Sequence, residues 1–354
     1  MMRFCLLFIL MFSCTWVNAQ DYTRYLSGQI NYGSIILHSQ ELRPIGASNP
    51  VGISLDYGKH KSSQKAWDAC NCYPRSGVSL TIWDFDNREV LGYGVTSLYY
   101  IQPVFRADQR FSFSIRAAAG VSVQSNPYDE EKNPDNLSYS TYWGIPLQLG
   151  VVAHYRFNGN WTIDLQAVLN HISNGGLSEP NKGINWPTLS LGFSRYFTVP
   201  LFENRAKTDW DKATSDLNRY DISTFTTYHS PSSRTLIFSW GLEAKYLRRV
   251  SRLSNLSVGS EYLFDNQKVS RSQEGLESDG HNLGLAIGHE FVLGKILFAQ
   301  QFAFYLIKPE SQLNDVYQRY TIVYRINERL NAGVGLKSHG HVADFGDFRL
   351  GVSF

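Results

Sequence analysis

A histidine and a serine two residues apart, His171 and Ser173, follow a segment in which apolar and polar residues alternate. Within 161–170 the apolar residues share the odd positions: Ile163, Leu165, Ala167 and Leu169. This period of two predicts a β-strand with one apolar face. If the strand continues to residue 173, the imidazole and the hydroxyl project from that apolar face, about 6.6 Å apart along the strand. A serine beside a histidine general base is the minimum for nucleophilic acyl transfer. Its apolar setting predicts a substrate that arrives from a membrane.

The run after the serine is rich in turn formers and side-chain amides. It reads Asn174-Gly175-Gly176 and then, after three residues, Pro180-Asn181-Lys182-Gly183. Donors for an oxyanion site can be assembled in such a run. The competing interpretation is that the histidine and the serine are two polar residues near a turn, with no chemical role.

The combined pattern resembles that of the PagL-type lipid A 3-O-deacylases of bacterial outer membranes. The shared elements are His-x-Ser-Asn at 171–174, a pair of small residues, Pro-Asn-x-Gly at 180–183 and a final strand at 189–197. The resemblance covers residues 22–200 and is strongest from 150 to 197. It implies an eight-stranded transmembrane β-barrel that removes an ester-linked acyl chain from lipid A, at the 3-position.

The resemblance also implies roles for individual residues. His171 carries over as the general base and Ser173 as the nucleophile, which forms an acyl-enzyme that water then hydrolyses. Asn174 and Asn181 match asparagines of the family. Together with Gly175 they are the expected site of oxyanion stabilisation, where one donor contributes about 3–4 kcal/mol in well-studied hydrolases.

This chain departs from the family pattern at one position, because Asn185 stands where the family has a glutamate. An asparagine can accept the imidazole N–H and hold the tautomer, but it brings no charge. We therefore rank Asn185 first as the third member of the triad, Glu179 second, and a site without a third member last.

The composition favours a β-barrel over a helical membrane protein. The chain of 354 residues contains 21 Tyr and 21 Phe, and its mean hydropathy is slightly negative. Barrel strands expose only alternate residues to lipid, so they do not need long apolar runs. Lys plus Arg (33) nearly balances Asp plus Glu (31), which gives no reason to expect nucleic acid as a partner.

Both ends of the chain predict export to a bacterial outer membrane. Arg3, the apolar run 4–12 and the small-residue site Val17-Asn18-Ala19 predict a signal peptide over 1–19 that is cleaved near Ala19. The final segment 348–354 alternates and ends in Phe354, like the terminal strands that the outer-membrane assembly machinery recognises. The alternative is an ordinary C-terminal strand. No other segment approaches 18 apolar residues, so insertion must be by strands.

Alternating segments and turn formers predict an all-β, antiparallel transmembrane β-barrel. A PagL-like segment with the catalytic motif covers 20–200, with strands expected at 27–37, 50–59, 77–84, 93–104, 110–122, 143–155, 161–171 and 187–199. A polar connection follows at 201–221. Further barrel strands cover 222–354, with strands expected at 222–229, 234–247, 254–264, 281–292, 296–306, 318–326, 331–338 and 346–354. Either one larger barrel or two tandem barrels fits this count.

A cysteine pair and a histidine-rich pattern are weak candidates for a disulfide or a metal site. Cys70 and Cys72 can form a strained disulfide at best, and a lone C-x-C lacks the other ligands of a zinc site. His339, His341 and Asp344 form a His-x-His-x-x-Asp pattern, but barrel turns often carry such residues. We expect neither a metal nor a cofactor.

The sequence therefore predicts an outer-membrane serine esterase, a carboxylic ester hydrolase, that removes an acyl chain from the lipid A of lipopolysaccharide. A phospholipase-type acyl hydrolase is the alternative among enzymes. A non-catalytic barrel, either a porin or a surface-binding protein, is the alternative from another class. Whether the chain forms a homodimer stays open.

Overall fold

The fold was analysed in a computed structural model, which describes residues 21–176, 178–207, 209, 217–232, 235–266, 279–309, 312–340 and 342–354. The expected signal peptide and its cleavage site lie outside these residues. No helix among them is long and apolar enough to cross a membrane.

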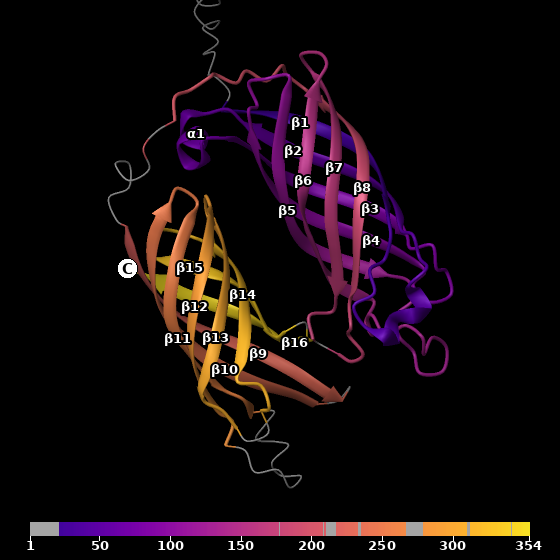
Figure 1. The fold of residues 1–354 in the computed structure, drawn as a ribbon, viewed down its shortest axis with the longest axis vertical. Coiled ribbons are helices and arrows are strands. Elements are labelled where there is room, and N and C mark those ends of the chain that lie inside the picture. The colour runs from indigo at the N-terminus through magenta and orange to yellow at the C-terminus, as the bar shows by residue number, and fades with distance from the viewer. Residues whose placement is uncertain are drawn as a thin grey trace, which may run out of the picture.

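The strands close into two separate eight-stranded antiparallel barrels (Figure 1). Barrel 1 consists of β1 (Tyr22–Gly33), β2 (Val51–Lys61), β3 (Tyr73–Asp84), β4 (Tyr93–Phe105), β5 (Phe111–Gln124), β6 (Trp143–Arg156), β7 (Trp161–Ser173) and β8 (Ile184–Tyr196). Barrel 2 consists of β9 (Asn218–Ser232), β10 (Thr235–Ser251), β11 (Ser254–Phe264), β12 (His281–Leu293), β13 (Ile296–Ile307), β14 (Val316–Arg325), β15 (Leu330–His339) and β16 (Val342–Ser353). Pairing of β1 with β8 and of β9 with β16 closes them, so the chain forms two tandem barrels.

Each predicted strand overlaps an observed one, but several ends differ. β3 begins at Tyr73 rather than at 77, and β9 begins at Asn218, inside the predicted polar connection 201–221. The first strand differs most. We expected a strand at 27–37, but β1 begins at Tyr22 and ends at Gly33. The chain then leaves the ladder and meets β8 again at an isolated bridge between Ile36 and Asn185. The alternation continues past Gly33, so periodicity alone does not mark the end of the strand.

Side chains alternate between an apolar outer wall and a polar interior. On β2, Ile53 faces outward and is 69% exposed, whereas the inward-facing Asp56 is 2% exposed. The Asp56 carboxylate lies 2.8 Å from the guanidinium of Arg116 inside barrel 1. This is the pattern of a transmembrane barrel, with the apolar face toward lipid.

The connections of barrel 1 are long at one end and mostly short at the other. Residues 34–50, 85–92, 125–142 and 174–183 connect strands at the long-loop end, which in outer-membrane barrels is the extracellular one. These loops fold over the mouth and bury a hydrophobic cluster, the loop plug: Ile35, Leu42, Ile45, Trp83, Phe85, Leu91, Tyr139, Ile172, Ile184 and Trp186. Burial raises the pKa of the Tyr139 hydroxyl, which stays protonated and donates to the Leu91 carbonyl at 3.2 Å. The plug holds the ends of β7 and β8 in place.

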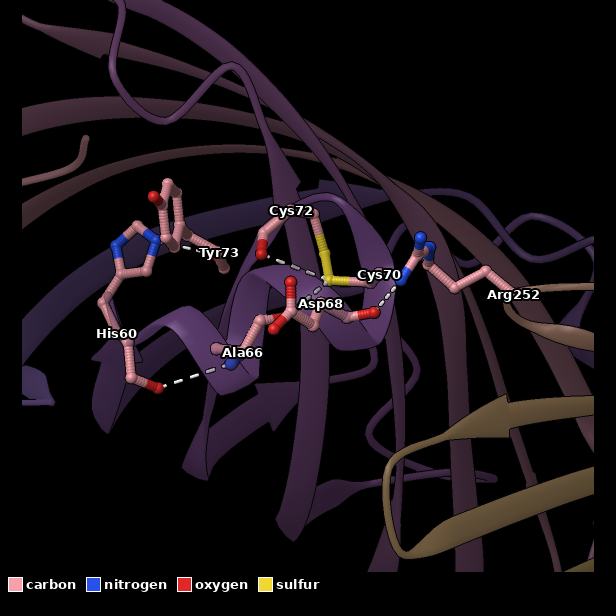
Figure 2. The surroundings of a disulfide bond; sticks show 8 residues. His60, Ala66, Asp68, Cys70, Cys72, Tyr73 and Arg252 are labelled. Atoms are coloured by element: carbon pink, nitrogen blue, oxygen red, sulfur yellow. Dashed lines mark hydrogen bonds between the residues drawn. A yellow bond between two sulfur atoms is a disulfide. The ribbon is translucent and has the colours of Figure 1, made fainter. Parts of the chain in front are cut away.

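A short helix, α1 (Gln64–Cys70), lies in the β2–β3 connection. A disulfide joins Cys70 and Cys72 at its end (Figure 2), with the two Cα atoms 5.0 Å apart, which is within the usual range. Arg252, in the β10–β11 turn of barrel 2, donates to the carbonyl of Asp68 on α1. The disulfide is therefore local, and the helix lies where the two barrels meet.

The interior of barrel 2 depends on buried ion pairs. The Asp347 carboxylate lies 2.6 Å from Arg319 and 2.9 Å from Arg349, and all three side chains are buried. We expect Asp347→Ala to lower the free energy of unfolding by about 3–5 kcal/mol, because it leaves two buried guanidinium groups undercompensated. Urea unfolding in detergent micelles measures this. The matched control is Asp315→Ala, which removes an exposed pair with Lys308 and should have little effect. Equal stability of the two variants would contradict the prediction.

Candidate active site

His171 and Ser173 both project from the outer wall of barrel 1, at the long-loop end of β7. They share that face with Leu165, which is 56% exposed, while Ile172 between them is fully buried in the loop plug. The pair therefore lies on the lipid-facing side of a closed barrel. It stands at the level where the strands give way to loops.

The imidazole of His171 is held from the neighbouring strand. His171 and Asn185 are directly paired in the β7–β8 register, and His171 Nδ1 lies 2.8 Å from Asn185 Oδ1. Because an amide oxygen can only accept, Nδ1 carries the proton and Nε2 is left with its lone pair. This is the tautomer that a general base needs.

A second histidine lies behind Asn185. The Asn185 Nδ2 group donates to His38 Nδ1 at 3.2 Å, and His38 Nε2 donates to the Lys182 carbonyl at 2.9 Å. These contacts fix the orientation of the amide, and with it the tautomer of His171. Sequence reasoning missed His38, because it stands alone in the β1–β2 loop, 147 residues from Asn185, with no spacing that marks it.

Glu179, the second-ranked candidate for the third member, is not brought to the imidazole. It is exposed, and its carboxylate accepts the backbone N–H of Asn181 at 3.0 Å. Of the two candidates, the structure places only Asn185 in contact with His171.

Gly183 lies against both reactive side chains. Its φ is +70°, and a methyl group added to it would stand 2.8 Å from His171 Cε1 and 3.4 Å from Ser173 Cβ. Within the described part of the chain the Ser173 hydroxyl makes no hydrogen bond, so it can turn toward His171 Nε2. In unliganded sites such hydrogen bonds often form only when substrate binds.

Most polar groups of the loop after Ser173 form hydrogen bonds within the loop itself. The Asn174 N–H donates to Asn181 Oδ1 at 2.8 Å, and the buried Asn174 side chain donates to the Ser178 carbonyl at 2.6 Å and accepts from the Gly176 N–H at 3.1 Å. The Gly175 N–H and Asn181 Nδ2 have no partner among the described residues. Of the expected oxyanion residues, Asn174 thus shapes the loop, while Gly175 and Asn181 keep unused donors.

A second Ser-His-Asp arrangement, which sequence reasoning also missed, lies inside barrel 1. Ser114 Oγ is 2.8 Å from His154 Nε2, and His154 Nδ1 is 2.6 Å from Asp164 Oδ1. All three side chains are buried, and Arg75 closes over Asp164 at 3.6 Å. No acyl chain can reach this hydroxyl, so the arrangement serves as part of the polar interior.

The His339 pattern does not assemble into a metal site. His339 Nδ1 lies 3.8 Å from Asp344, and its Nε2 contacts the Tyr305 hydroxyl at 3.1 Å. His341 lies outside the described residues. Across the residues that the structure does describe, no three His, Cys, Asp or Glu side chains cluster as metal ligands.

Comparison with known families finds matches to both barrels. The family model described as "Lipid A 3-O-deacylase (PagL)" matches residues 51–194, and the one described as "Acyloxyacyl hydrolase, C-terminal domain" matches residues 218–354. This chain belongs to the PagL family. The first match includes His171, Ser173 and Asn185, and the second covers barrel 2 from its first strand. A search of curated proteins finds no match.

Several solved structures are similar to this PagL-family chain. The outer-membrane enzyme PagL is 15% identical with a TM-score of 0.35, and the match covers 49% of this chain and 99% of that one. Neisserial surface protein A is 12% identical with a TM-score of 0.34, covering 49% and 97%. The β domain of the Bordetella autotransporter BrkA is 7% identical with a TM-score of 0.26, covering 94% and 99%.

The contact of Gly183 with the imidazole generates a test of the geometry. We expect Gly183→Ala to lower acyl hydrolysis at least ~10-fold, because the added methyl displaces the His171 ring and the backbone has a positive φ. Hydrolysis of a lipid ester in detergent measures this, and heat-modifiable migration in SDS gels checks that the barrel is closed. Gly294→Ala is the matched control, since that glycine also has a positive φ but has open space around it. Full activity of Gly183→Ala would contradict the assigned geometry.

Proposed function

We propose that this protein is an outer-membrane serine esterase that removes an ester-linked acyl chain, at the 3-position, from the lipid A of lipopolysaccharide. The observation that carries the proposal is that His171 and Ser173 face lipid while His171 Nδ1 lies 2.8 Å from the Asn185 side-chain oxygen, which leaves Nε2 to act as the base. Export after removal of residues 1–19 and insertion by the assembly machinery of the outer membrane belong to the same proposal.

The reaction begins when the Ser173 hydroxyl attacks the acyl carbonyl of the substrate. Its proton passes to His171 Nε2, and the carbonyl becomes a tetrahedral oxyanion that the Gly175 N–H and Asn181 Nδ2 stabilise. Collapse breaks the ester C–O bond, and the proton on His171 passes to the departing sugar oxygen. The sugar leaves as an alcohol and the acyl chain remains on Ser173.

Deacylation repeats the same steps with water as the nucleophile. His171 Nε2 accepts a proton from the water, whose oxygen attacks the acyl-enzyme carbonyl. Collapse releases the fatty acid and returns the proton to Ser173. Throughout, Asn185 holds the Nδ1 proton of His171 in place without exchanging it.

The depth of the site supports lipid A as the substrate class. Ser173 is the last residue of β7, at the long-loop end that faces outward from the cell. Lipopolysaccharide occupies the outer leaflet, so its ester-linked chains lie beside this end of the wall. A phospholipid substrate would favour the opposite end, and a porin-like role would leave the outward-facing Ser-His pair without a purpose.

The two Ser-His pairs of barrel 1 allow a direct test of the nucleophile. We expect Ser173→Ala to abolish the loss of one hydroxyacyl mass from lipid A, with a decrease of about 10⁴-fold or more. Mass spectrometry of lipid A from cells that express each variant measures this. Ser114→Ala, in the buried interior, should leave the mass loss unchanged. If Ser173→Ala cells still lose the chain, or if wild-type cells never lose it, the proposal is wrong.

The contacts of His171 generate a graded prediction. We expect Asn185→Ala to lower kcat about 10²-fold, because the tautomer of His171 is then no longer held, and His38→Ala to lower it about fivefold, because one neutral hydrogen bond behind the amide is lost. Glu179→Gln keeps an oxygen for the Asn181 N–H and should change the rate less than twofold. Rates on purified lipid A in detergent decide the order. A larger effect at Glu179 than at Asn185 would contradict it.

A further inference from the structure

Barrel 2 has a hollow of about 590 Å³ on its wall, across β11, β12, β13 and β14. These strands are consecutive neighbours in the barrel (Figure 1). Leu256, Ile287 and Phe302 contribute an apolar, outward-facing lining. A hollow of this kind on a membrane-facing wall can accommodate part of a lipid acyl chain.

A row of polar side chains crosses the same hollow. His289, Gln300 and Tyr320 are directly paired across β12, β13 and β14, and all three line the hollow. Polar groups on the lipid-facing wall of a barrel are costly unless they meet a polar partner. The Gln300 amide and the Tyr320 hydroxyl make no hydrogen bond to any residue that the structure describes. The row therefore presents unused hydrogen-bonding groups to the membrane.

Ser254 and His289 form a second outward-facing pair, because Ser254 Oγ is hydrogen-bonded to His289 Nε2. It differs from the pair on β7 in one respect. In the described chain, nothing accepts or donates at His289 Nδ1, so no third group holds the tautomer. The pair has the chemistry of a hydrogen-bonding site for a ligand rather than that of an oriented nucleophile and base.

The depth of the row points to the periplasmic leaflet. His289 and Gln300 each stand four residues from the short β12–β13 turn, at Leu293 and Ile296. With about 3.4 Å per residue and a tilt of about 40°, the row lies about 10 Å above the rim of the barrel. Ester groups of a glycerophospholipid in that leaflet lie near this level.

One cation stands below the row on the membrane side, at the rim itself. Lys295 is exposed in the β12–β13 turn, and its Nζ lies 5.7 Å from the ring centre of the outward-facing Tyr324. Arg325 points into the barrel instead, because it shares its face of β14 with the buried Arg319. Within the described ranges Lys295 has no carboxylate within salt-bridge distance, and Glu328 is the acid of the adjacent β14–β15 turn. A phosphate group beneath the hollow would meet the positive charge of Lys295.

We propose that this wall of barrel 2 binds an anionic glycerophospholipid of the periplasmic leaflet. One acyl chain fills the hollow beside Ile287 and Phe302. The ester carbonyls accept hydrogen bonds from Gln300 and Tyr320, and the phosphate lies beside Lys295. This site is separate from Ser173 and does not depend on the chemistry proposed there.

Native mass spectrometry of the full chain tests the proposal, with phosphatidylglycerol as the probe and the Ser173→Ala protein as the background. We expect one retained phosphatidylglycerol. In the double variant His289→Leu/Gln300→Leu, the occupancy of the lipid should fall at least ~10-fold. The barrel itself should still fold, because leucine suits a lipid-facing wall, and persistent heat-modifiable migration would show this. The matched control is His281→Leu, on the same face of β12 but at its far end, which should retain the lipid.

The charge at the rim provides an independent readout. Lys295→Glu should lower the preference for phosphatidylglycerol over phosphatidylethanolamine at least ~3-fold, since it places a negative charge beside the phosphate. Unchanged retention in the double leucine variant, or an unchanged preference in Lys295→Glu, would overturn the proposal. Two other results would also overturn it. One is that the double leucine variant loses a protein dimer and not a bound lipid. The other is that the protein releases fatty acid from the probe in a reaction that requires Ser254.

Discussion

Ile172 and Ile184 are fully buried beneath the loops of barrel 1, and this burial sets the register in which β7 and β8 meet. A slip of one residue would turn both isoleucines outward and bring polar neighbours into the plug, so the register is strongly specified. Because alternate residues face opposite sides, the same packing turns His171, Ser173 and Asn185 toward lipid. The hydrophobic plug and the reactive side chains are thus two faces of one pair of strands.

The group that orients His171 is uncharged. A carboxylate at position 185 would stand on the lipid-facing wall, where an unpaired charge is costly. The amide of Asn185 avoids that cost, and it gains a second anchor because its Nδ2 reaches His38. The orientation of the general base therefore depends on the β1–β2 loop as well as on β8. Two carboxylates of barrel 1, Asp56 and Asp164, lie inside instead, where each meets an arginine.

The positions of the strands could be predicted from the local alternation of residues, but the pairing of distant strands could not. A period of two locates strands such as β7 and tells which face Ser173 occupies, because both depend only on neighbouring residues. Closure into two barrels depends on which distant strands pair, β1 with β8 and β9 with β16, and periodicity carries no information about that. The same limit applies to His38, whose partner is remote in the chain. Composition also does not reveal which donors of the loop after Ser173 are already hydrogen-bonded, as those of Asn174 are, and which are free within the described chain, as that of Gly175 is.

Each barrel has an even number of strands, so the chain leaves it on the side from which it entered. The connection between β8 and β9 thus begins and ends on the periplasmic side. With an odd number of strands in the first barrel, the second barrel would begin on the opposite side of the membrane and have the inverted orientation. Because each barrel has an even number of strands, barrels can follow one another in one polypeptide. Each barrel then closes by pairing its own first and last strands, and all have the same orientation in the bilayer.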